Sequence, residues 1–582
     1  MDTIISESND TMINQLNVGL PETSQYITDR RFVNYFPSGS NVYAPNAGNK
    51  DVRFYISGDS NQYLDLSSVR LFATLQNTDG TREKFLRPLG GLHSFFQGYR
   101  ATVGGQLVQD IIEYNRHCEL FKSFKSKDVN EMDDIESCAN PSWDDDYRKY
   151  ANGLDNFIKL NGNDPPDGVD VEPTGDHNEW GKIDFRHTRH SLCGIAGANG
   201  KMRLGHKPCC GLLESNYYLP LRFAPLELEF TIVSDGNEPI VVPEGNGTTE
   251  TDKNGHYFQG GNTSTSWEIN NVIIRAEVIT LDNTVDNNIT KHLLEGQSLK
   301  LIVPQYHTLT QTFNTGGGEI NMNIVKSASK LSTAFITLYR EKRQGERYGQ
   351  FMPDNYVHKR WNYFYNPMIN GEINDGPAAA SVPLQEGKGF QDYTRNLSWQ
   401  LQVANKKWPE FECQSLSEAF YLLRRTLHYM NADQNSVNIS YKQYRENKFI
   451  IGVSFEKMAD VNFTGQNTKM GSLITFKIKA TEGTLVEAEQ IQEIFVHMVS
   501  ESVLELRESG SLVYDSISIS NNNRDVKRKH NPFMFNFYDI YFLKKYLFRC
   551  IITRKRTTRE TTEQIYIQQW QVLLHLWQIQ DI

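Results

Sequence analysis

Short runs of alternating apolar and polar residues recur along most of this chain, and they constrain its fold more than any other feature. The clearest run is apolar at every second position, at Leu226, Leu228, Phe230 and Ile232. A strand with one face against a core and the other in water shows this period of two. Similar runs begin at Val52, Val69, Val272, Leu299, Ile320, Phe335, Trp399, Phe449 and Ile474. The pattern predicts an all-β protein of many short strands.

Turn-forming residues separate these runs, and the length of the chain indicates more than one core. Thr78-Asp79-Gly80 and Gly104-Gly105 each follow an alternating run, and glycine permits the positive φ that tight turns require. A chain of 582 residues is too long for one ordinary core. Two sandwiches of about 200 to 250 residues each fit that length. We therefore expect two consecutive sandwiches, joined between Glu214 and Leu309.

Changes in composition divide the chain into four parts. An extended N-terminal arm is expected where periodicity is weak, and a tail of uncertain order where Lys527-Arg528-Lys529 and further basic runs occur. The alternating run from Val272 is interpreted as the opening strand of the second sandwich. The predicted boundaries are 1–48 for the arm, 49–265 for the first sandwich, 266–515 for the second sandwich and 516–582 for the tail.

Insertions and two short helices interrupt the strands. The acidic segment 125–180, the polar segment 234–266 and the aromatic-rich segment 341–390 are expected to be long loops. Residues 111–124 fit a short amphipathic helix. A second helix is expected from Ser415, because Ser415 and Glu418 form a capping box. Residues 491–506 fit either helix or strand, and we favour strand.

Charge and cysteine content exclude several classes of protein. The net charge of −10 argues against a protein whose bulk coats nucleic acid, because phosphate binding needs a surplus of Lys and Arg. Seven scattered cysteines do not make a disulfide framework and favour a reducing compartment. No apolar run approaches the roughly 20 residues that span a bilayer, and the first residues lack a signal-peptide core. We expect no membrane span and no secretion by a signal of its own.

Three segments resemble binding motifs, but none has the required spacing. His187 and His190 with Cys193 approach a zinc pattern, whereas the adjacent Cys209-Cys210 pair does not. The acidic run 144–146 lacks the alternating carboxylates of a calcium loop. The run 316–318 lacks the lysine and the helix of a phosphate loop. We therefore expect no catalytic, cofactor or metal site, no small-molecule substrate and no enzymatic activity.

The order of several short segments resembles that of a known family. They are Phe54-Tyr55-Ile56-Ser57-Gly58, Tyr63-Leu64-Asp65-Leu66, Leu219-Pro220-Leu221, Pro225-Leu226-Glu227-Leu228, Ile273-Ile274-Arg275-Ala276-Glu277-Val278 and Arg507-Glu508-Ser509-Gly510-Ser511-Leu512-Val513-Tyr514-Asp515. Between Arg53 and Asp515 the chain resembles the double jelly-roll major capsid proteins of Polinton/Maverick elements, Polinton-like viruses and adintoviruses, in the lineage that includes adenovirus hexon. The tail departs from the usual ending of that family.

The resemblance implies a structural protein of a viral shell. Its expected fold is two eight-stranded jelly rolls, and its expected assembly is a homotrimer with a pseudo-hexagonal outline. Neighbouring capsomers and a minor penton protein would be its partners, in an icosahedral virion assembled in the cytoplasm or nucleus of a host cell. Because exposed aromatic clusters mark interfaces, we predict that four residues are buried between subunits. They are Trp361, Tyr363, Phe364 and Tyr365.

Two other functions remain open on the sequence. A β-sandwich that binds carbohydrate is compatible with the eight Trp and 28 Tyr residues, whose rings could stack on sugars. It predicts a stable monomer that binds glycans, whereas the capsid interpretation predicts trimers and shell-like particles. A metal-dependent sandwich enzyme would need ligands that the predicted strands do not supply, and metal analysis would test it.

Overall fold

A computed structural model of the chain describes most of the predicted sandwich region. The chain divides into two compact units, 1–517 and 518–582, and every described residue belongs to the first. The described residues are 26–125 without 60, 83, 87 and 89; 195–240; 264–313; 319–340; 359–367; 397–429; 439, 441, 444 and 448–457; 464–469; 473–480; 491–508; and 510–514.

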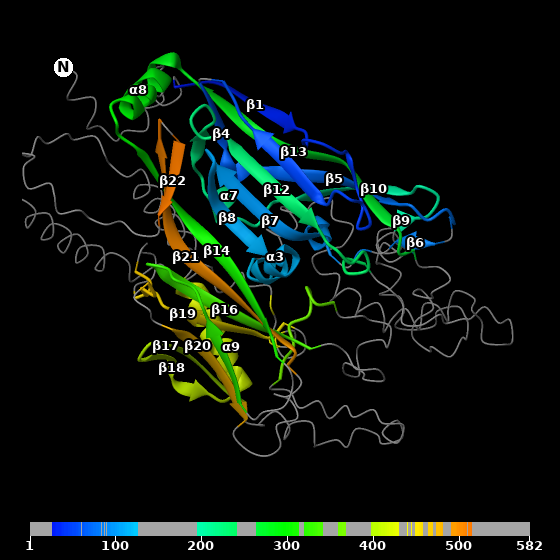
Figure 1. Ribbon diagram of the computed structural model, residues 1–582, viewed down its shortest axis with the longest axis vertical. Coiled ribbons are helices and arrows are strands. Elements are labelled where there is room, and N and C mark those ends of the chain that lie inside the picture. Colours follow the sequence, from blue (N-terminus) through cyan, green and yellow to red (C-terminus); the bar gives the residue numbers. More distant parts are fainter. Residues whose placement is uncertain are drawn as a thin grey trace, which may run out of the picture. The chain divides into compact units, whose positions relative to one another are not determined.

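The first jelly roll consists of two antiparallel sheets (Figure 1). Its eight main strands are β1 (Ile27–Tyr35), β3 (Asp51–Ile56), β5 (Arg70–Asn77), β7 (Phe96–Val103), β8 (Gln106–Ile112), β10 (Lys201–His206), β12 (Leu226–Ile232) and β13 (Trp267–Leu281). The β13 sheet has the order β1-β13-β5-β10, and the β12 sheet has the order β3-β12-β7-β8. Short strands β2 (Val42–Tyr43), β4 (Gln62–Asp65) and β11 (Tyr218–Pro220) extend the β13 sheet, and β6 (Phe85–Leu86) pairs with β9 (Ile195–Ala196).

The second jelly roll is likewise built from two antiparallel sheets. Its strands are β14 (Leu299–Thr312), β15 (Glu319–Ile324), β16 (Leu331–Tyr339), β17 (Leu397–Val403), β18 (Lys406–Cys413), β19 (Ile450–Ser454), β20 (Ile474–Ala480), β21 (Glu493–Arg507) and β22 (Gly510–Tyr514). The β21 sheet has the order β14-β21-β16-β19, with β22 paired to β21, and the β20 sheet has the order β15-β20-β17-β18. All of these pairings are antiparallel.

The two sandwiches share one strand connectivity. In each, the first, eighth, third and sixth main strands form one sheet, and the second, seventh, fourth and fifth form the other. Both also place a helix directly after the fifth strand, α3 (Tyr114–Ser123) in the first and α9 (Leu416–Tyr429) in the second. The predicted fold class is confirmed, since the chain contains two consecutive eight-stranded jelly rolls.

The predicted boundary between the two sandwiches is wrong. The run from Val272 lies in β13, which pairs with β1, β4 and β5 and is therefore the eighth strand of the first jelly roll. The division falls instead at α8 (Asn283–Leu294), which connects β13 to β14. The predicted arm is also too long, because β1 and β2 belong to the β13 sheet. Residues 1–25, the tail and most of the predicted insertions lie outside the described residues.

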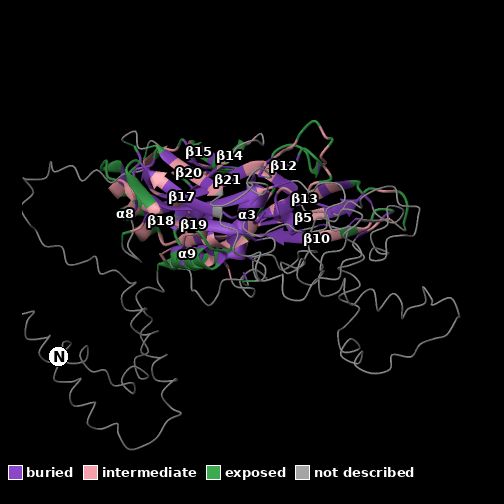
Figure 2. Cartoon of the chain, turned by 90° about the horizontal axis from the view of Figure 1, so that it is seen from below, coloured by how far each residue is buried: buried purple, intermediate pink, exposed green. Residues whose placement is uncertain are grey.

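Local signals in the sequence correspond well to the elements that form. In β12, Leu226, Leu228, Phe230 and Ile232 are buried while the residues between them are not. The hydroxyl of Ser415 accepts a hydrogen bond from the backbone N–H of Glu418 at 3.2 Å, which caps α9 as predicted. Residues 493–507 form strand β21, as favoured. Figure 2 shows buried residues throughout the strands and exposed residues along α9.

Candidate functional site at the junction of the two jelly rolls

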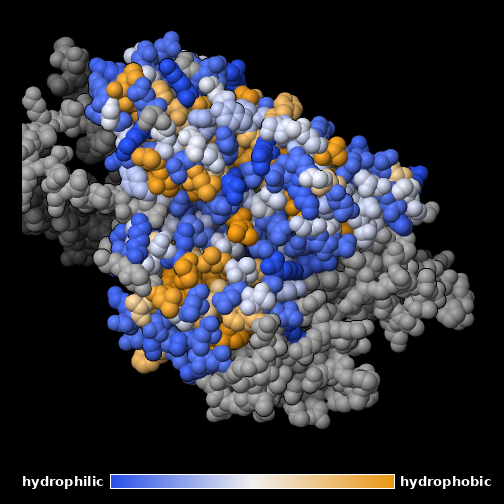
Figure 3. Space-filling view, viewed as in Figure 1, coloured by the Kyte–Doolittle hydropathy of each residue, from blue (hydrophilic) through white to orange (hydrophobic). Residues whose placement is uncertain are grey.

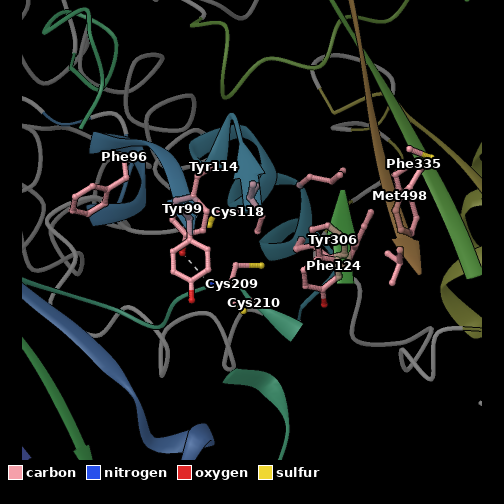
Figure 4. Packing of buried hydrophobic residues seen from close by; sticks show 14 of the residues in the cluster. Phe96, Tyr99, Tyr114, Cys118, Phe124, Cys209, Cys210, Tyr306, Phe335 and Met498 are labelled. Atoms are coloured by element: carbon pink, nitrogen blue, oxygen red, sulfur yellow. Dashed lines mark hydrogen bonds between the residues drawn. The ribbon is translucent and has the colours of Figure 1, made fainter. Parts of the chain in front are cut away.

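Helix α3 lies between the two jelly rolls and is buried on both of its faces. Eight of its ten residues are buried, whereas a surface helix exposes one face. On the side of the first jelly roll, Tyr114 stacks on Tyr99 with ring centroids 5.1 Å apart. On the other side, Phe121 meets Tyr306 of β14 at 4.7 Å and Phe335 of β16 at 5.9 Å. Figure 4 shows Tyr99 and Tyr114 with Cys118, Cys209 and Cys210 near them, and Tyr306 beside Phe124.

Arg116 carries a buried charge from α3 into the second jelly roll. Its side chain is fully buried. The guanidinium donates to Thr337 Oγ1 from Nε at 3.1 Å and from Nη2 at 2.9 Å, and Nη2 also donates to the carbonyl of Leu338 at 3.2 Å. Nη1 donates to the carbonyl of Tyr363 at 2.9 Å and to that of Arg360. All five donors of the guanidinium are therefore used.

Aromatic rings enclose the same guanidinium. Its central carbon lies 4.1 Å from the ring centroid of Phe495 and 4.7 Å from that of Phe364. Burial lowers the pKa of Arg116 to about 9, because the charged form loses its hydration. The lost hydration is offset by neutral acceptors and ring faces, since each of the five hydrogen bonds goes to a carbonyl or hydroxyl oxygen.

Ion pairs surround this centre. Arg360 bridges the two jelly rolls, with Nη1 2.7 Å from Glu113 Oε1 and Nε 2.6 Å from Glu493 Oε2. Lys448 forms an ion pair with Glu119 of α3. Burial alone would raise the pKa of Glu119, but the charge of Lys448 and a hydrogen bond with His93 hold this pKa well below its usual range. The charge of Glu119 is thus neutralised by Lys448 from the second jelly roll.

Glutamine side chains connect strand β8 to strand β14 of the second jelly roll, with hydrogen bonds like those between paired strands. The backbone N–H of Tyr306 in β14 donates to Gln109 Oε1 at 3.1 Å, and Gln109 Nε2 donates back to the carbonyl of Tyr306. Gln305 Nε2 donates to the carbonyl of Val108 at 2.8 Å. Ser511 of β22 bonds the carbonyl of Val103. Side chains of the second jelly roll therefore satisfy the backbone carbonyls of Val108 in β8 and Val103 at the end of β7.

The four aromatic residues predicted to lie between subunits are buried within a single chain. Trp361 is 1% exposed, and its Nε1 donates to the carbonyl of Glu238 in the first jelly roll at 2.9 Å. Phe364 is fully buried beneath Arg116 and Lys448. Tyr363 and Tyr365 are 3% and 6% exposed. The interpretation that assigned their burial to a subunit contact is corrected, because the junction accounts for it.

Two buried histidines also meet at the junction. The rings of His117 in α3 and His497 in β21 lie 5.7 Å apart, and both residues are almost fully buried. Among the described residues, neither ring nitrogen of His117 has a hydrogen-bond partner. Burial, together with the charges of His117 and Arg116, holds the pKa of His497 well below its usual value. Burial likewise lowers the pKa of His93 to about 4.

The structure provides no support for the motifs weighed as binding sites. Within the described ranges, no group of three or more His, Cys, Asp or Glu residues could hold a metal ion. Cys209 and Cys210 are free and buried, and burial raises the pKa of the Cys210 thiol to about 11. His177, His187, His190, Cys193 and the runs 144–146 and 316–318 lie outside the described residues. No helix in the described part of the chain is long and apolar enough to cross a membrane.

Comparison with known proteins gives similarities of fold only. No protein-family model matches the chain, and no curated protein matches it. PBCV-1 VP54, fitted into a reconstruction of the virophage Sputnik, is 9% identical over 86% of this chain and 100% of its own, with a TM-score of 0.47. The Sputnik virophage structure is 10% identical over 91% and 96%, with a TM-score of 0.44. The mavirus major capsid protein is 9% identical over 88% and 94%, with a TM-score of 0.37.

These identities and scores are too low to assign a family. The fold rests instead on the strand pairings, which give the same eight-strand order twice in one chain. The contacts of α3 and β8 show in addition that the two sandwiches pack together along a buried junction. The chain is therefore an all-β protein of two jelly rolls joined side by side.

Proposed function

We propose that the chain is a major capsid protein, a structural subunit that assembles with copies of itself. The observation that carries the proposal is the junction, where a helix with eight buried residues out of ten fastens two jelly rolls of equal connectivity into one block. Closed sandwiches leave few sheet edges open, and a fixed pair of them presents surfaces in a constant geometry. Such a block suits repeated assembly. The resemblance of residues 53–515 to double jelly-roll capsid proteins supports the same function.

In this proposal, three chains form a pseudo-hexameric capsomer, and capsomers tile an icosahedral shell. Closed cyclic assembly is a common outcome for soluble oligomers. Neighbouring capsomers and a minor penton protein are the proposed partners, and the virion is the proposed location, after assembly in the cytoplasm or nucleus of the host cell. The proposed lineage is that of Polinton/Maverick elements, Polinton-like viruses and adintoviruses. The proposed role requires no catalytic residue or cofactor.

The described tryptophans do not favour the carbohydrate-binding alternative. Sugar stacking needs accessible aromatic faces, but Trp267, Trp361 and Trp399 are each at most 3% exposed. Trp408 is half-buried and contacts Phe455 at 5.1 Å. We therefore retain the capsid function alone.

Purified full-length protein tests the proposal. Light scattering coupled to size exclusion should give three chains of 66.9 kDa, about 200 kDa in total. Shell-like particles should appear when the protein is concentrated or expressed at high level. A protein that stays monomeric across a hundredfold range of concentration, or that binds glycans as a monomer, would contradict the proposal.

A further inference from the structure

His117 and His497, called the histidine pair below, face each other across the junction, one from each jelly roll. His117 lies on α3, which is beside β14 in Figure 1. His497 lies in the middle of β21, where it pairs with Thr308 of β14 and Phe335 of β16. The two ring centroids are 5.7 Å apart, and the ring planes are tilted by 42°. Each ring thus belongs to one jelly roll and meets the other roll.

The histidine pair is buried with almost no hydrogen bonding. Both residues are at most 1% exposed. Within the described ranges, Nδ1 and Nε2 of His117 and Nε2 of His497 have no hydrogen-bond partner. The remaining nitrogen, Nδ1 of His497, lies 3.4 Å from Thr308 Oγ1, which is long for a hydrogen bond. Buried polar groups are nearly always paired, so unpaired ones in a core call for an explanation.

The nearest surroundings of the pair are aromatic or positively charged. The ring centroid of His117 lies 4.6 Å from that of Phe121 and 5.0 Å from that of Tyr306. Besides His117, the charged group that acts on His497 is Arg116, and both act to disfavour a proton on His497. Among the described residues, no carboxylate acts on His497.

The carboxylates near the junction have other partners. They are Glu113 and Glu493, both paired with Arg360, Glu119 paired with Lys448, Glu214 paired with Lys125 and with the hydroxyl of Tyr306, and Glu501, which also has a contact partner. The other titratable groups on the elements around the pair are Tyr114, Cys118 and Lys122 of α3, Cys209 and Cys210 before α7 (Gly211–Glu214), Tyr306 and His307 of β14, Tyr339 of β16, Arg340 after it, and Lys359, Tyr363 and Tyr365.

The closed junction therefore disfavours a proton on the pair. A neutral imidazole has one N–H, and an imidazolium has two. In the buried site, the added N–H of His497 would have no carboxylate to accept it, and the charge would lie near Arg116 without hydration. Hydrophilic residues cover much of the outer surface in Figure 3, but the pair is not part of that surface. The pair becomes hydrated only when the junction opens, and an imidazole in water takes up a proton near pH 6.5.

We propose that the histidine pair makes the junction acid-sensitive, so that acid separates α3 from the β21 sheet while each jelly roll keeps its own sheets. The position of the pair favours this local opening over general unfolding. Helix α3 packs on β7 of the first jelly roll, and β21 is a central strand of the second, so each ring stays with a complete sandwich when the rolls part. The inference concerns a single chain and does not depend on the proposed function.

The expected size of the effect follows from one proton. A histidine that is neutral in the closed junction and titrates near pH 6.5 in the open one raises the opening equilibrium about tenfold between pH 7.5 and pH 5.5. Glu238 acts in the opposite direction, because burial raises its pKa to about 7, and its carbonyl accepts the hydrogen bond of Trp361 at the junction. The test therefore compares variants at each pH, since Glu238 is present in all of them.

Labelling of Cys209 with a pyridyl disulfide measures the opening of the junction in the full-length chain. Cys209 is 5% exposed, and its thiol lies against the ring of His117. Cys413 is fully buried at the end of β18, so its labelling reports the opening of the second jelly roll itself. Mass spectrometry of the labelled peptides gives both rates. Each rate is divided by that of the urea-unfolded protein at the same pH, which removes the intrinsic pH dependence of the thiol.

His497→Phe removes the titrating group and keeps a ring of similar size. From pH 7.5 to pH 5.5, the relative labelling of Cys209 should rise about tenfold more in the unchanged protein than in this variant. His307→Phe is the matched control. Burial lowers the pKa of His307 to about 3, but its side chain is on the opposite face of β14 from Thr308 and lies against Ser500. The control should label like the unchanged protein. If His497→Phe does not fold, His497→Gln replaces it with the same expected result.

Two results would overturn the inference. One is an equal rise in Cys209 labelling for the unchanged protein and the His497 variant. The other is labelling of Cys413 at the same relative rate as Cys209 in acid, because the second jelly roll would then open together with the junction. Both results would leave the capsid function standing, since light scattering tests that function separately.

Discussion

Replacing Arg116 by alanine should loosen the junction more than any surface change. The substitution removes five hydrogen bonds to four acceptors and the stacking on two rings. Each buried acceptor left without a donor costs about 1 to 3 kcal/mol, and the lost stacking adds about 2 kcal/mol. The cavity left by the side chain adds to this cost.

One contribution acts in the opposite direction. Burial lowers the pKa of Arg116 to about 9, because the charged side chain has lost its hydration. An alanine at position 116 carries no charge, so the variant does not lose this hydration on folding. We therefore expect a net loss of about 3 to 5 kcal/mol in the free energy of unfolding, the usual range when a large buried side chain is reduced to alanine.

Urea denaturation of the full-length chain, followed by tryptophan fluorescence, measures this effect. Because the junction couples the two jelly rolls, the Arg116→Ala variant should also unfold in two separated transitions. Arg100→Ala is the matched control, since Arg100 is half-exposed and forms surface ion pairs with Asp110 and Glu229, each worth about 1 kcal/mol or less. Equal midpoints for the two variants would refute the reasoning.

Three further predictions test the packing and charge of the junction. Acid should destabilise the protein, because burial lowers the pKa of His93 to about 4 and also lowers that of His497, whereas both protonate near pH 6.5 when unfolded. Stability present above pH 6.5 is therefore lost as the pH falls toward the folded pKa. The free energy of unfolding from urea titrations should be lower at pH 5 than at pH 7, by about 2 kcal/mol for His93 alone, and equal values would contradict this. Gly90→Ala should cost about 1 to 3 kcal/mol, since its new Cβ would lie 2.5 Å from Trp361 Cη2, and the thermal midpoint should fall relative to Gly80→Ala, whose Cβ meets nothing within 4 Å. Trp361→Ser should lower the free energy of unfolding by about 3 to 5 kcal/mol, and an unchanged midpoint would show that the side chain is not needed for the fold of the single chain.

Local patterns were sufficient to predict the strands and the cap of α9. The alternation along Leu226–Ile232 predicts that one face of the strand is buried. This pattern depends on residue order alone. Ser415 and Glu418 lie three residues apart, so their hydrogen bond could also be anticipated. The two-sandwich organisation followed from length and from the number of such runs.

Pairing across long distances could not be predicted. The run from Val272 has the same alternation whichever sheet it joins, and its partners β1 and β5 are distant in sequence. Periodicity predicted an amphipathic helix over residues 111–124, but periodicity does not show that a second sandwich covers the other face of that helix. The aromatic run near Trp361 was interpreted as a contact between subunits, but the hydrogen bond of Trp361 is made to Glu238 in the first jelly roll of the same chain.

Negative-stain electron microscopy of the purified full-length protein tests the central claim most directly. The account predicts particles with a hexagonal outline and six lobes, two from each of three chains, because each chain contributes two jelly rolls. Uniform two-lobed particles the size of a single chain, seen at concentrations where light scattering detects no larger species, would contradict it.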